Sequence, residues 1–278
     1  MKIFRSPTPA TPPDFDVVHL IHMAMDLSTA RGVSPVRFMS MGGDVKRRRT
    51  GMRWSPSALR GCPRKSIYKA VGVRPYPGFK VSVKDQMVFD RGTVIGGWVA
   101  AYFRALEAEG AISDVECQCV DREEVLVTDE SLNYGGFIDI LFTYESRRYI
   151  VEVKSKDNDD ALGKISKPSE DHLGQLNDYM ALKSVYQGWV LYAGLIEAGG
   201  RQSLDFRSFP HAFDAQRWEN SKNRISSLEL LYAQPNRMPP GTSNKYFECP
   251  TCPYRLQCDA LQSPAKAKEL QDGSSPES

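Results

Sequence analysis

Two apolar runs separated by a short polar turn place the tightest constraint on how this chain can fold. Residues 135–145 read GGFIDILFTYE and residues 147–156 read RRYIVEVKSK. Apolar runs on both sides of a short turn predict an antiparallel β-hairpin with largely buried strands. Each run nevertheless contains a carboxylate, Asp139 in the first and Glu152 in the second. Because a lone ionised carboxylate is costly to bury, each of these side chains requires a partner.

Strand alternation suggests what that partner is. Ile150, Glu152 and Lys154 share one face of their strand, since side chains alternate along a strand. If the hairpin register brings Asp139 to the same end of that face, two carboxylates and a lysine meet. The carboxylates would repel each other unless one is protonated or a divalent cation binds them, and oxygen ligands favour Mg²⁺ or Mn²⁺ over zinc. A metal, a water and a lysine together are suited to phosphodiester hydrolysis. The alternative is a buried carboxylate–lysine ion pair that only holds the hairpin together.

The remaining hydrophobic periodicity predicts the fold class. We expect helices over residues 14–30, 56–61, 91–109, 170–186 and 213–233 with a further helix after Pro63, and strands over 113–127 and 187–196. Helices interspersed with strands predict a mixed α/β domain with helices packed on a central sheet. We expect a partly flexible, basic N-terminal extension over 1–53, a main domain over 54–261 and a flexible tail over 262–278.

Composition limits the class of partner and the compartment. The 278 residues are 41% hydrophobic and 25% charged, and the net charge of +2 does not by itself indicate a nucleic-acid partner. The first residues, MKIFRSPTPATPPDF, lack the apolar segment of a secretory signal, and no apolar run is long enough to span a membrane. We therefore expect no membrane association and a cytoplasmic location, in the host cytoplasm if a virus encodes the protein. The six cysteines are then expected to be ligands or free thiols.

Three short motifs follow one another along the chain: GFID at 136–139, EVK at 152–154 and QLNDY at 175–179. Together they resemble the GxxD, (D/E)xK and QxxxY motifs of RecB-like nucleases in the PD-(D/E)XK superfamily. The resemblance extends from about residue 54 to residue 258. It implies a restriction-endonuclease-like core with a mixed central sheet flanked by helices. It also implies a metal-dependent DNA exonuclease acting on single strands or ends, and many family members digest 5′→3′.

The resemblance also assigns roles to residues. Asp139 and Glu152 would bind Mg²⁺ or Mn²⁺ together with the backbone carbonyl of Val153. Lys154 would assist the attacking water.

The other family positions lie on either side of this pair. Gln175 and Tyr179 are four residues apart, so on a helix they share a face, which in the family looks onto the active site and the DNA backbone. Glu116, in the expected strand SDVECQCV, resembles an upstream acidic residue that could support a second metal, and its alternative is a solvent-facing strand residue. Gly96 departs from the family pattern, because it stands where relatives often have a histidine ligand. This departure supports a second hypothesis, a DNA-binding module whose nuclease site has weakened or decayed.

The cysteines form a separate constellation. Cys249, Cys252 and Cys258 make a CxxCx₅C segment, and a tetrahedral zinc site or an iron–sulfur cluster would need a fourth ligand, for which Cys62 in LRGCPRK is the candidate. Spacing alone leaves zinc and iron–sulfur equally open. The arrangement of one early and three late cysteines resembles iron–sulfur RecB-like nucleases, which include CRISPR-associated adaptation nucleases and AddB-type helicase–nuclease subunits. The resemblance implies a [4Fe–4S] cluster that closes the nuclease domain.

The segment around Cys62 also suggests a surface for DNA. Phosphates could be contacted by four basic side chains, Arg60, Arg64, Lys65 and Lys69. Trp54 and Tyr68 could stack on unpaired bases. The alternative is surface charge over aromatic core residues. Protein partners or a homo-oligomer remain open, since no interface can be read from the sequence.

Overall fold

The computed structural model describes residues 11–31, 50–76, 78–117, 125–156, 162–198, 201–234, 249 and 251–262. Its main sheet contains five strands in the order β1-β4-β5-β6-β7. These strands are β1 (Ser113–Cys117), β4 (Ile140–Tyr144), β5 (Arg147–Lys156), β6 (Gln187–Ala198) and β7 (Arg201–Ala212). Strands β5 and β6 are parallel and the other neighbours are antiparallel, so the sheet is mixed. A second sheet pairs β2 (Val125–Asp129) with β3 (Tyr134–Ile138), which the 3₁₀ turn η2 (Glu130–Leu132) connects.

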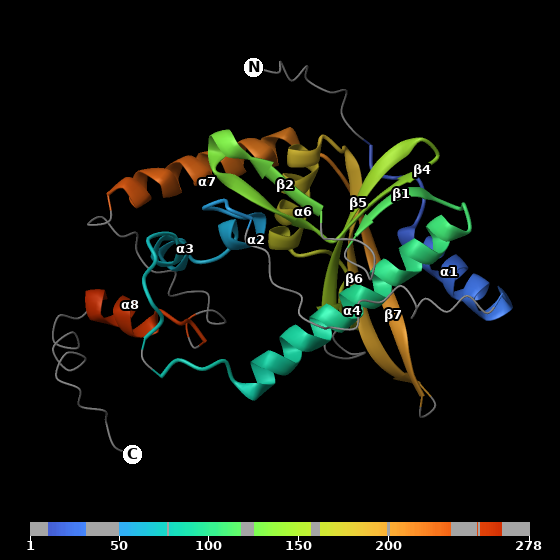
Figure 1. The fold of residues 1–278 in the computed structure, drawn as a ribbon, viewed down its shortest axis with the longest axis horizontal. Coiled ribbons are helices and arrows are strands. Elements are labelled where there is room, and N and C mark those ends of the chain that lie inside the picture. The colour runs from blue at the N-terminus through green and yellow to red at the C-terminus, as the bar shows by residue number, and fades with distance from the viewer. Residues whose placement is uncertain are drawn as a thin grey trace.

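Helices flank the main sheet on both faces. Helices α1 (Val17–Arg31) and α4 (Val83–Ala108) pack together against one face, and α6 (Glu170–Lys183) packs against the other, with α7 (Ala215–Ala233) beside it. The short helices α2 (Pro56–Leu59) and α3 (Pro63–Ala70) lie near α7, and α8 (Arg255–Gln262) lies on the far side of α3 (Figure 1). The expected mixed α/β fold, with a central mixed sheet flanked by helices, is confirmed.

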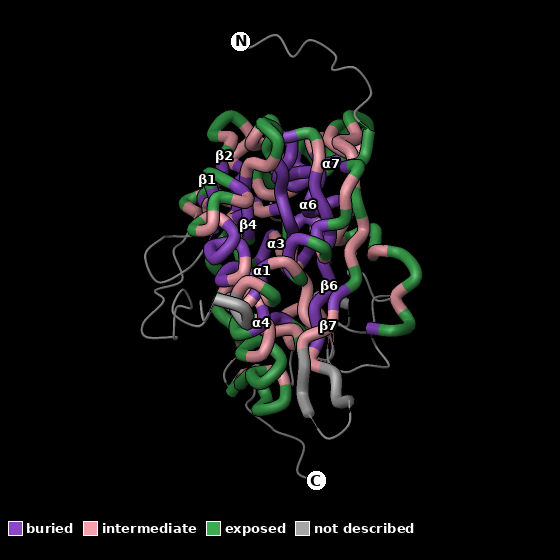
Figure 2. Tube along the Cα trace, turned by 90° about the vertical axis from the view of Figure 1, so that its right-hand side faces the viewer, coloured by how far each residue is buried: buried purple, intermediate pink, exposed green. Residues whose placement is uncertain are grey.

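Alternation along β5 separates two apolar cores. Tyr149 and Val151 belong to the core that α1 and α4 cover, and Ile150 belongs to the core beneath α6. Strand β6 alternates in the same way, with Trp189 on the first face and Tyr192 on the second. Figure 2 shows α6 and β6 as largely buried elements. Glu152 and Lys154 therefore point toward α6, the side predicted for the polar site by the period of two.

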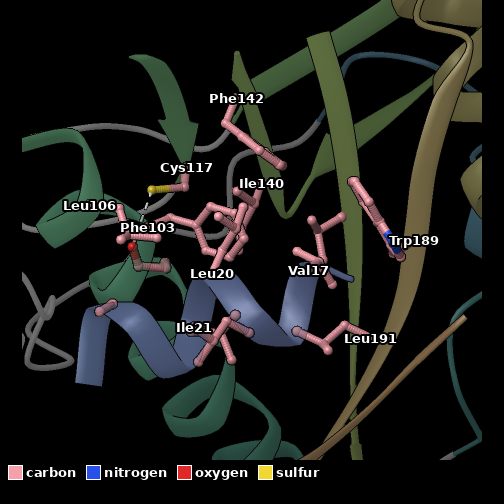
Figure 3. Close-up of a cluster of buried hydrophobic side chains, with 14 of the residues drawn as sticks. Val17, Leu20, Ile21, Phe103, Leu106, Cys117, Ile140, Phe142, Trp189 and Leu191 are labelled. Atoms are coloured by element: carbon pink, nitrogen blue, oxygen red, sulfur yellow. Dashed lines mark hydrogen bonds between the residues drawn. The ribbon is translucent and has the colours of Figure 1, made fainter. Parts of the chain in front are cut away.

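Helix α1 is part of the core rather than an appendage. Val17, Leu20 and Ile21 are at most 2% exposed and pack against α4 and the sheet (Figure 3). Figure 3 also shows Cys117 of β1 in this core, where its thiol faces the carbonyl of Ala100. Residues 17–27, which the sequence assigns to an N-terminal extension, thus pack with the main domain. Residues 1–10, 32–49 and the predicted tail beyond Gln262 lie outside the described residues.

Several sequence expectations about secondary structure are wrong in detail. The expected strand over 135–145 is broken at Asp139, where the chain leaves the small sheet and enters the main one. Residues 113–127 likewise contribute to two different sheets, and the long helix begins at Val83 instead of residue 91. Strand β7 and helix α8 were not expected. Capping explains the early start of α4, because Ser82 accepts a hydrogen bond from the Asp85 N–H.

Candidate active site

Asp139 and Glu152 come together where the two sheets meet. The β4–β5 register pairs Ile140 with Val151. Asp139, which precedes Ile140, therefore lies next to Glu152, which follows Val151. The Val153 N–H donates a hydrogen bond of 2.7 Å to Asp139 Oδ2, which fixes this carboxylate at the end of the hairpin. The register condition set by the sequence is therefore met.

Lys154 links the carboxylate pair to α6. Its Nζ lies 2.6 Å from Glu152 Oε1 and donates a 3.0 Å hydrogen bond to Gln175 Oε1. Gln175 Nε2 in turn lies 3.4 Å from the Tyr179 hydroxyl, one turn along the same helix. The structure thus brings Asp139, Glu152, Lys154, Gln175 and Tyr179 into one chain of polar contacts.

The carboxylates are held in an electrostatically unfavourable state. Burial and the neighbouring Asp139 raise the pKa of Glu152 to about 8, and the attraction of Lys154 offsets this only in part. Glu152 is 1% exposed, and its Oε2 has no hydrogen-bond partner among the described residues. Asp139 keeps an exposed face, yet the protein around its carboxylate raises its pKa in spite of Lys154 and the Val153 N–H. Burial lowers the pKa of Lys154, but the two carboxylates outweigh that effect and leave it raised.

Glycine is required at one position of this site. A Cβ atom at Gly136 would lie 2.9 Å from the Tyr179 ring and 3.0 Å from Pro56 Cδ. Tyr179 is buried against β3 by this close approach, and burial with the two nearby carboxylates raises its pKa well above the usual value. The first and third motifs of the sequence are therefore in direct contact.

A second polar network anchors α6. Asp178 accepts hydrogen bonds from Arg60 (2.5 Å) and Tyr134 (2.6 Å) through Oδ2 and from Ser221 (2.6 Å) through Oδ1. These donors come from three different parts of the chain, so the network ties α6 to the residue after α2, to β3 and to α7. Asp178 was not predicted as a site residue, although an aspartate among the apolar residues of LNDYMAL indicates a buried partner.

The structure does not bring Glu116 into the carboxylate pair's network. Glu116 is the register partner of Leu141 on β4, and its carboxylate lies 2.8 Å from Arg148 and 3.5 Å from Lys183 in a partly exposed cluster. Gly96 lies on α4, and a Cβ atom there would meet nothing within 4 Å. Trp54 and Tyr68 are 2% and 5% exposed, so the expectation that they stack on bases is wrong.

The cysteines come from two packed segments. Cys62 precedes α3, while Cys252 and Cys258 flank the start of α8. The segments touch, since the Tyr76 N–H donates to the Pro253 carbonyl (3.1 Å) and the rings of Tyr68 and Tyr254 are 5.3 Å apart. Burial raises the pKa of Cys252, and electrostatic interaction with the thiols of Cys62 and Cys258 raises it further.

The contacts of the cysteines show whether they could hold a metal or cluster. Arg64 donates a 2.9 Å hydrogen bond to the Cys258 sulfur, and Cys249 joins Cys252 through a backbone hydrogen bond. Among the described residues, however, no three histidine, cysteine, aspartate or glutamate side chains are close enough to hold a metal ion. Thiolates are the ligand type that zinc and iron–sulfur clusters prefer, but as placed the described cysteines do not form a ligand set. None of the described helices is long and apolar enough to cross a membrane.

Comparisons with known proteins give remote likenesses only. No protein-family model matches the sequence, and no curated protein matches it. Among solved structures, SSO0001 is similar over 91% of this chain and 99% of its own, with 13% identity and a TM-score of 0.40. An alkaline exonuclease (LHK-Exo) from Laribacter hongkongensis is similar over 67% of this chain and 93% of its own, with 13% identity and a TM-score of 0.45. The structure of LHK-Exo in complex with dAMP is similar over 67% of this chain and 90% of its own, with 12% identity and a TM-score of 0.43. All three scores are below 0.5, so we base no inference on them.

Proposed function

We propose that this protein is a divalent-metal-dependent nuclease that hydrolyses DNA phosphodiester bonds at the Asp139–Glu152–Lys154 site. The observation that supports this most directly is Glu152, a fully buried carboxylate that has a second carboxylate beside it and one oxygen with no partner in the described part of the chain. A fold has little reason to keep such a group for stability alone, because burying an acidic group that has an unpartnered oxygen and a second carboxylate beside it is destabilising. A cation between the two carboxylates would remove both the repulsion and the unpaired oxygen.

The available ligands favour a hard cation. Asp139, Glu152 and the Val153 carbonyl provide oxygen donors, which suit Mg²⁺ or Mn²⁺ that keep several waters of their own. When bound, the cation would lower the pKa of a water and polarise the phosphate. Glu116 is proposed at most as an outer support for a second ion, since Arg148 and Lys183 already pair with it.

Lys154 is proposed as the group that orients the attacking water and stabilises charge on the scissile phosphate. Its ammonium stays protonated because both carboxylates raise its pKa. Gln175 holds that ammonium at 3.0 Å, and Tyr179 holds Gln175. The two helix residues therefore act by positioning Lys154, and a fixed donor of this kind needs no reorganisation during the reaction.

The finer features of the activity rest on the resemblance of the three motifs. We propose exonuclease action on single strands or DNA ends, 5′-phosphate products and 5′→3′ digestion. We also propose a structural [4Fe–4S] cluster held by Cys62, Cys249, Cys252 and Cys258, which would join the segment before α3 to the segment around α8. A cluster at this place would act by cross-linking distant segments, so its binding free energy would add to the free energy of unfolding.

A second candidate function is a DNA-binding module whose nuclease site is weakened. Gly96 favours it, since no side chain from this position of α4 is available as a further ligand. The intact polar network from Asp139 to Tyr179 favours the nuclease.

One assay separates the two candidates. End-labelled single-stranded and double-stranded DNA is incubated with Mn²⁺, Mg²⁺ or EDTA, with label at either end to give the polarity. We expect metal-dependent digestion by the wild type and none by Asp139→Ala or Lys154→Ala. Binding without cleavage by the wild type would reject the nuclease. Visible absorption and metal content after anaerobic purification test the cluster, and a colourless protein with stoichiometric zinc would reject iron–sulfur.

A further inference from the structure

Two side chains beside Lys154 have no role in the reaction described above. Tyr192 is the register partner of Lys154 on the neighbouring parallel strand, and both side chains face α6. His172 lies on α6 one turn before Gln175, and its Nδ1 is 2.7 Å from the Tyr192 hydroxyl. His172 and Tyr192 therefore extend the row of polar side chains that begins at Glu152 and Lys154, and we call this row the polar strip.

The hydrogen bonds of Tyr192 fix the tautomer of His172. The Ser169 N–H donates a 3.0 Å hydrogen bond to the Tyr192 oxygen. The hydroxyl has one proton of its own, and among the described residues His172 Nδ1 is the acceptor within its reach. Burial lowers the pKa of His172 to about 4, and the charges of Lys154 and Lys156 contribute to that shift. A neutral imidazole whose Nδ1 accepts the Tyr192 hydroxyl proton carries its own ring proton on Nε2.

The Nε2–H is an available donor next to positive charge. The His172 ring is half-buried, and its Nε2 has no acceptor among the described residues. Lys156 follows Lys154 by two residues on the same strand face, about 6.6 Å further along β5. Its Nζ lies 5.3 Å from the centre of the Tyr192 ring. A neutral N–H donor and an ammonium therefore converge at the outer end of the strip, where an anion would satisfy both.

We propose that His172 and Lys156 form a second phosphate subsite, which binds the DNA phosphodiester next to the scissile one. This rests on the nuclease function proposed above. His172 donates Nε2–H to a phosphate oxygen and Lys156 supplies charge. Tyr192 is a positioning residue, because it holds the imidazole as the donor tautomer. In this arrangement Nε2–H donates to phosphate, so the subsite predicts that His172 has no part in metal binding.

The test measures binding, so it does not depend on cleavage. Each variant is made in full-length protein with Asp139→Asn, and affinity for a fluorescent single-stranded oligonucleotide is measured over a range of salt. We expect His172→Phe to weaken binding about tenfold, because a hydrogen bond to a charged group is lost. His172→Gln retains an N–H donor and recovers most of the affinity. His211→Phe, a histidine on β7 outside the strip, is the matched control and leaves affinity unchanged.

Salt dependence separates the two groups of the subsite. Lys156→Gln is expected to reduce the slope of log affinity against log salt by about 0.7, the value for one contact to a single strand. His172→Phe leaves that slope unchanged because the imidazole is neutral. Nitrogen-15 spectra at pH 7 are expected to show the Nε2–H tautomer, and Tyr192→Phe to shift it toward a mixture of tautomers.

Three outcomes would overturn the subsite. One is equal DNA affinity of His172→Phe and its parent, and another is a cationic or Nδ1–H imidazole at pH 7. The third is weaker Mn²⁺ binding by His172→Phe without DNA, which would make His172 a metal ligand. If DNA binding depends on His172 while the wild type cleaves nothing, the subsite stands and the nuclease proposal fails.

Discussion

Two buried acidic side chains, Asp178 on α6 and Glu152 on β5, differ in how completely the surrounding residues hydrogen-bond them. Asp178 is fully buried, and both of its oxygens accept hydrogen bonds, from Arg60, Tyr134 and Ser221. Glu152 is equally inaccessible, but the residues that the structure describes leave one of its oxygens without a partner, and another carboxylate lies beside it. The contacts of Asp178 therefore stabilise the fold, whereas those of Glu152 leave it incompletely hydrogen-bonded.

This difference separates a structural carboxylate from a functional one. Burial raises the pKa of both groups, but at Asp178 the guanidinium and two hydroxyl donors oppose the shift. At Glu152 Asp139 adds to it. Natural sequences depart from local satisfaction chiefly at functional sites, where a ligand or substrate completes the set. Removing Asp178 should therefore damage the fold, and removing Glu152 or Asp139 should damage activity alone.

The largest expected effect is on stability at Asp178. Asp178→Ala leaves the partly buried Arg60 guanidinium without its carboxylate and the Tyr134 hydroxyl without its acceptor, and we expect the free energy of unfolding to fall by about 3–5 kcal/mol. Urea unfolding measures it. Glu170→Ala on the same helix is the control, because its carboxylate is 76% exposed and pairs with Arg217 at the surface, where a pair contributes about 0–1 kcal/mol. Similar losses in the two variants would contradict the structural role of Asp178.

Asp139→Asn is expected to lower activity strongly without lowering the free energy of unfolding. We expect kcat/KM on single-stranded DNA with Mn²⁺ to fall at least about a hundredfold, since one group that stabilises transition-state charge contributes several kcal/mol. The unfolding free energy in EDTA should stay the same or rise, because the repulsion with Glu152 is removed. Asp205→Asn, a partly exposed position on β7, serves as the control for activity. A variant that loses stability and activity together would make Asp139 structural.

The pH dependence of stability sharpens the same contrast. The Glu152 pKa is about 8 in the folded protein and 4.5 as the ordinary value, so between these pH values the folded state binds the extra proton. Stability without metal must then fall as pH rises through this window, by on the order of a few kcal/mol at most. We expect wild type in EDTA to lose more unfolding free energy from pH 5 to 8 than Glu152→Gln does. Saturating Mn²⁺ should remove the difference. Equal slopes for the two proteins in EDTA would contradict the assignment.

The sequence contained the local part of this site but not its supports. The period of two placed Glu152 and Lys154 on one face, and the spacing of four placed Gln175 and Tyr179 on another. Both are short-range regularities of single elements. Asp178 escaped notice because its donors are scattered from Arg60 to Ser221. No local pattern reports such long-range convergence.

Strand β7 and the break at Asp139 could not be predicted from the sequence for a similar reason. Strand β7, RQSLDFRSFPHA, is an edge strand with many polar residues and a proline, so its pattern is weaker than that of the interior β6. The break at Asp139 was hidden because the apolar character continues through it from Ile138 to Ile140. Tertiary pairing with two different sheets, not local propensity, divides this run.

The smallest expected effect is at Gly136, where the fold and the site meet. In Gly136→Ala the added methyl would lie 2.9 Å from the Tyr179 ring, so Tyr179 must shift and take Gln175 and Lys154 with it. Overpacking of this kind costs about 1–3 kcal/mol. We expect a loss of stability within that range and a further fall in kcat, because Lys154 is less well held.

Gly97→Ala is the matched control for that substitution. A Cβ atom at Gly97 meets nothing within 4 Å, and the residue lies inside α4. Alanine stabilises a helix interior by roughly 0.5–1 kcal/mol relative to glycine, so this variant should gain stability and keep its activity. Urea unfolding and the DNA digestion assay on both variants decide the matter. If Gly136→Ala keeps full kcat, the contact between Gly136 and Tyr179 does not position Lys154, and Gln175 alone must hold it.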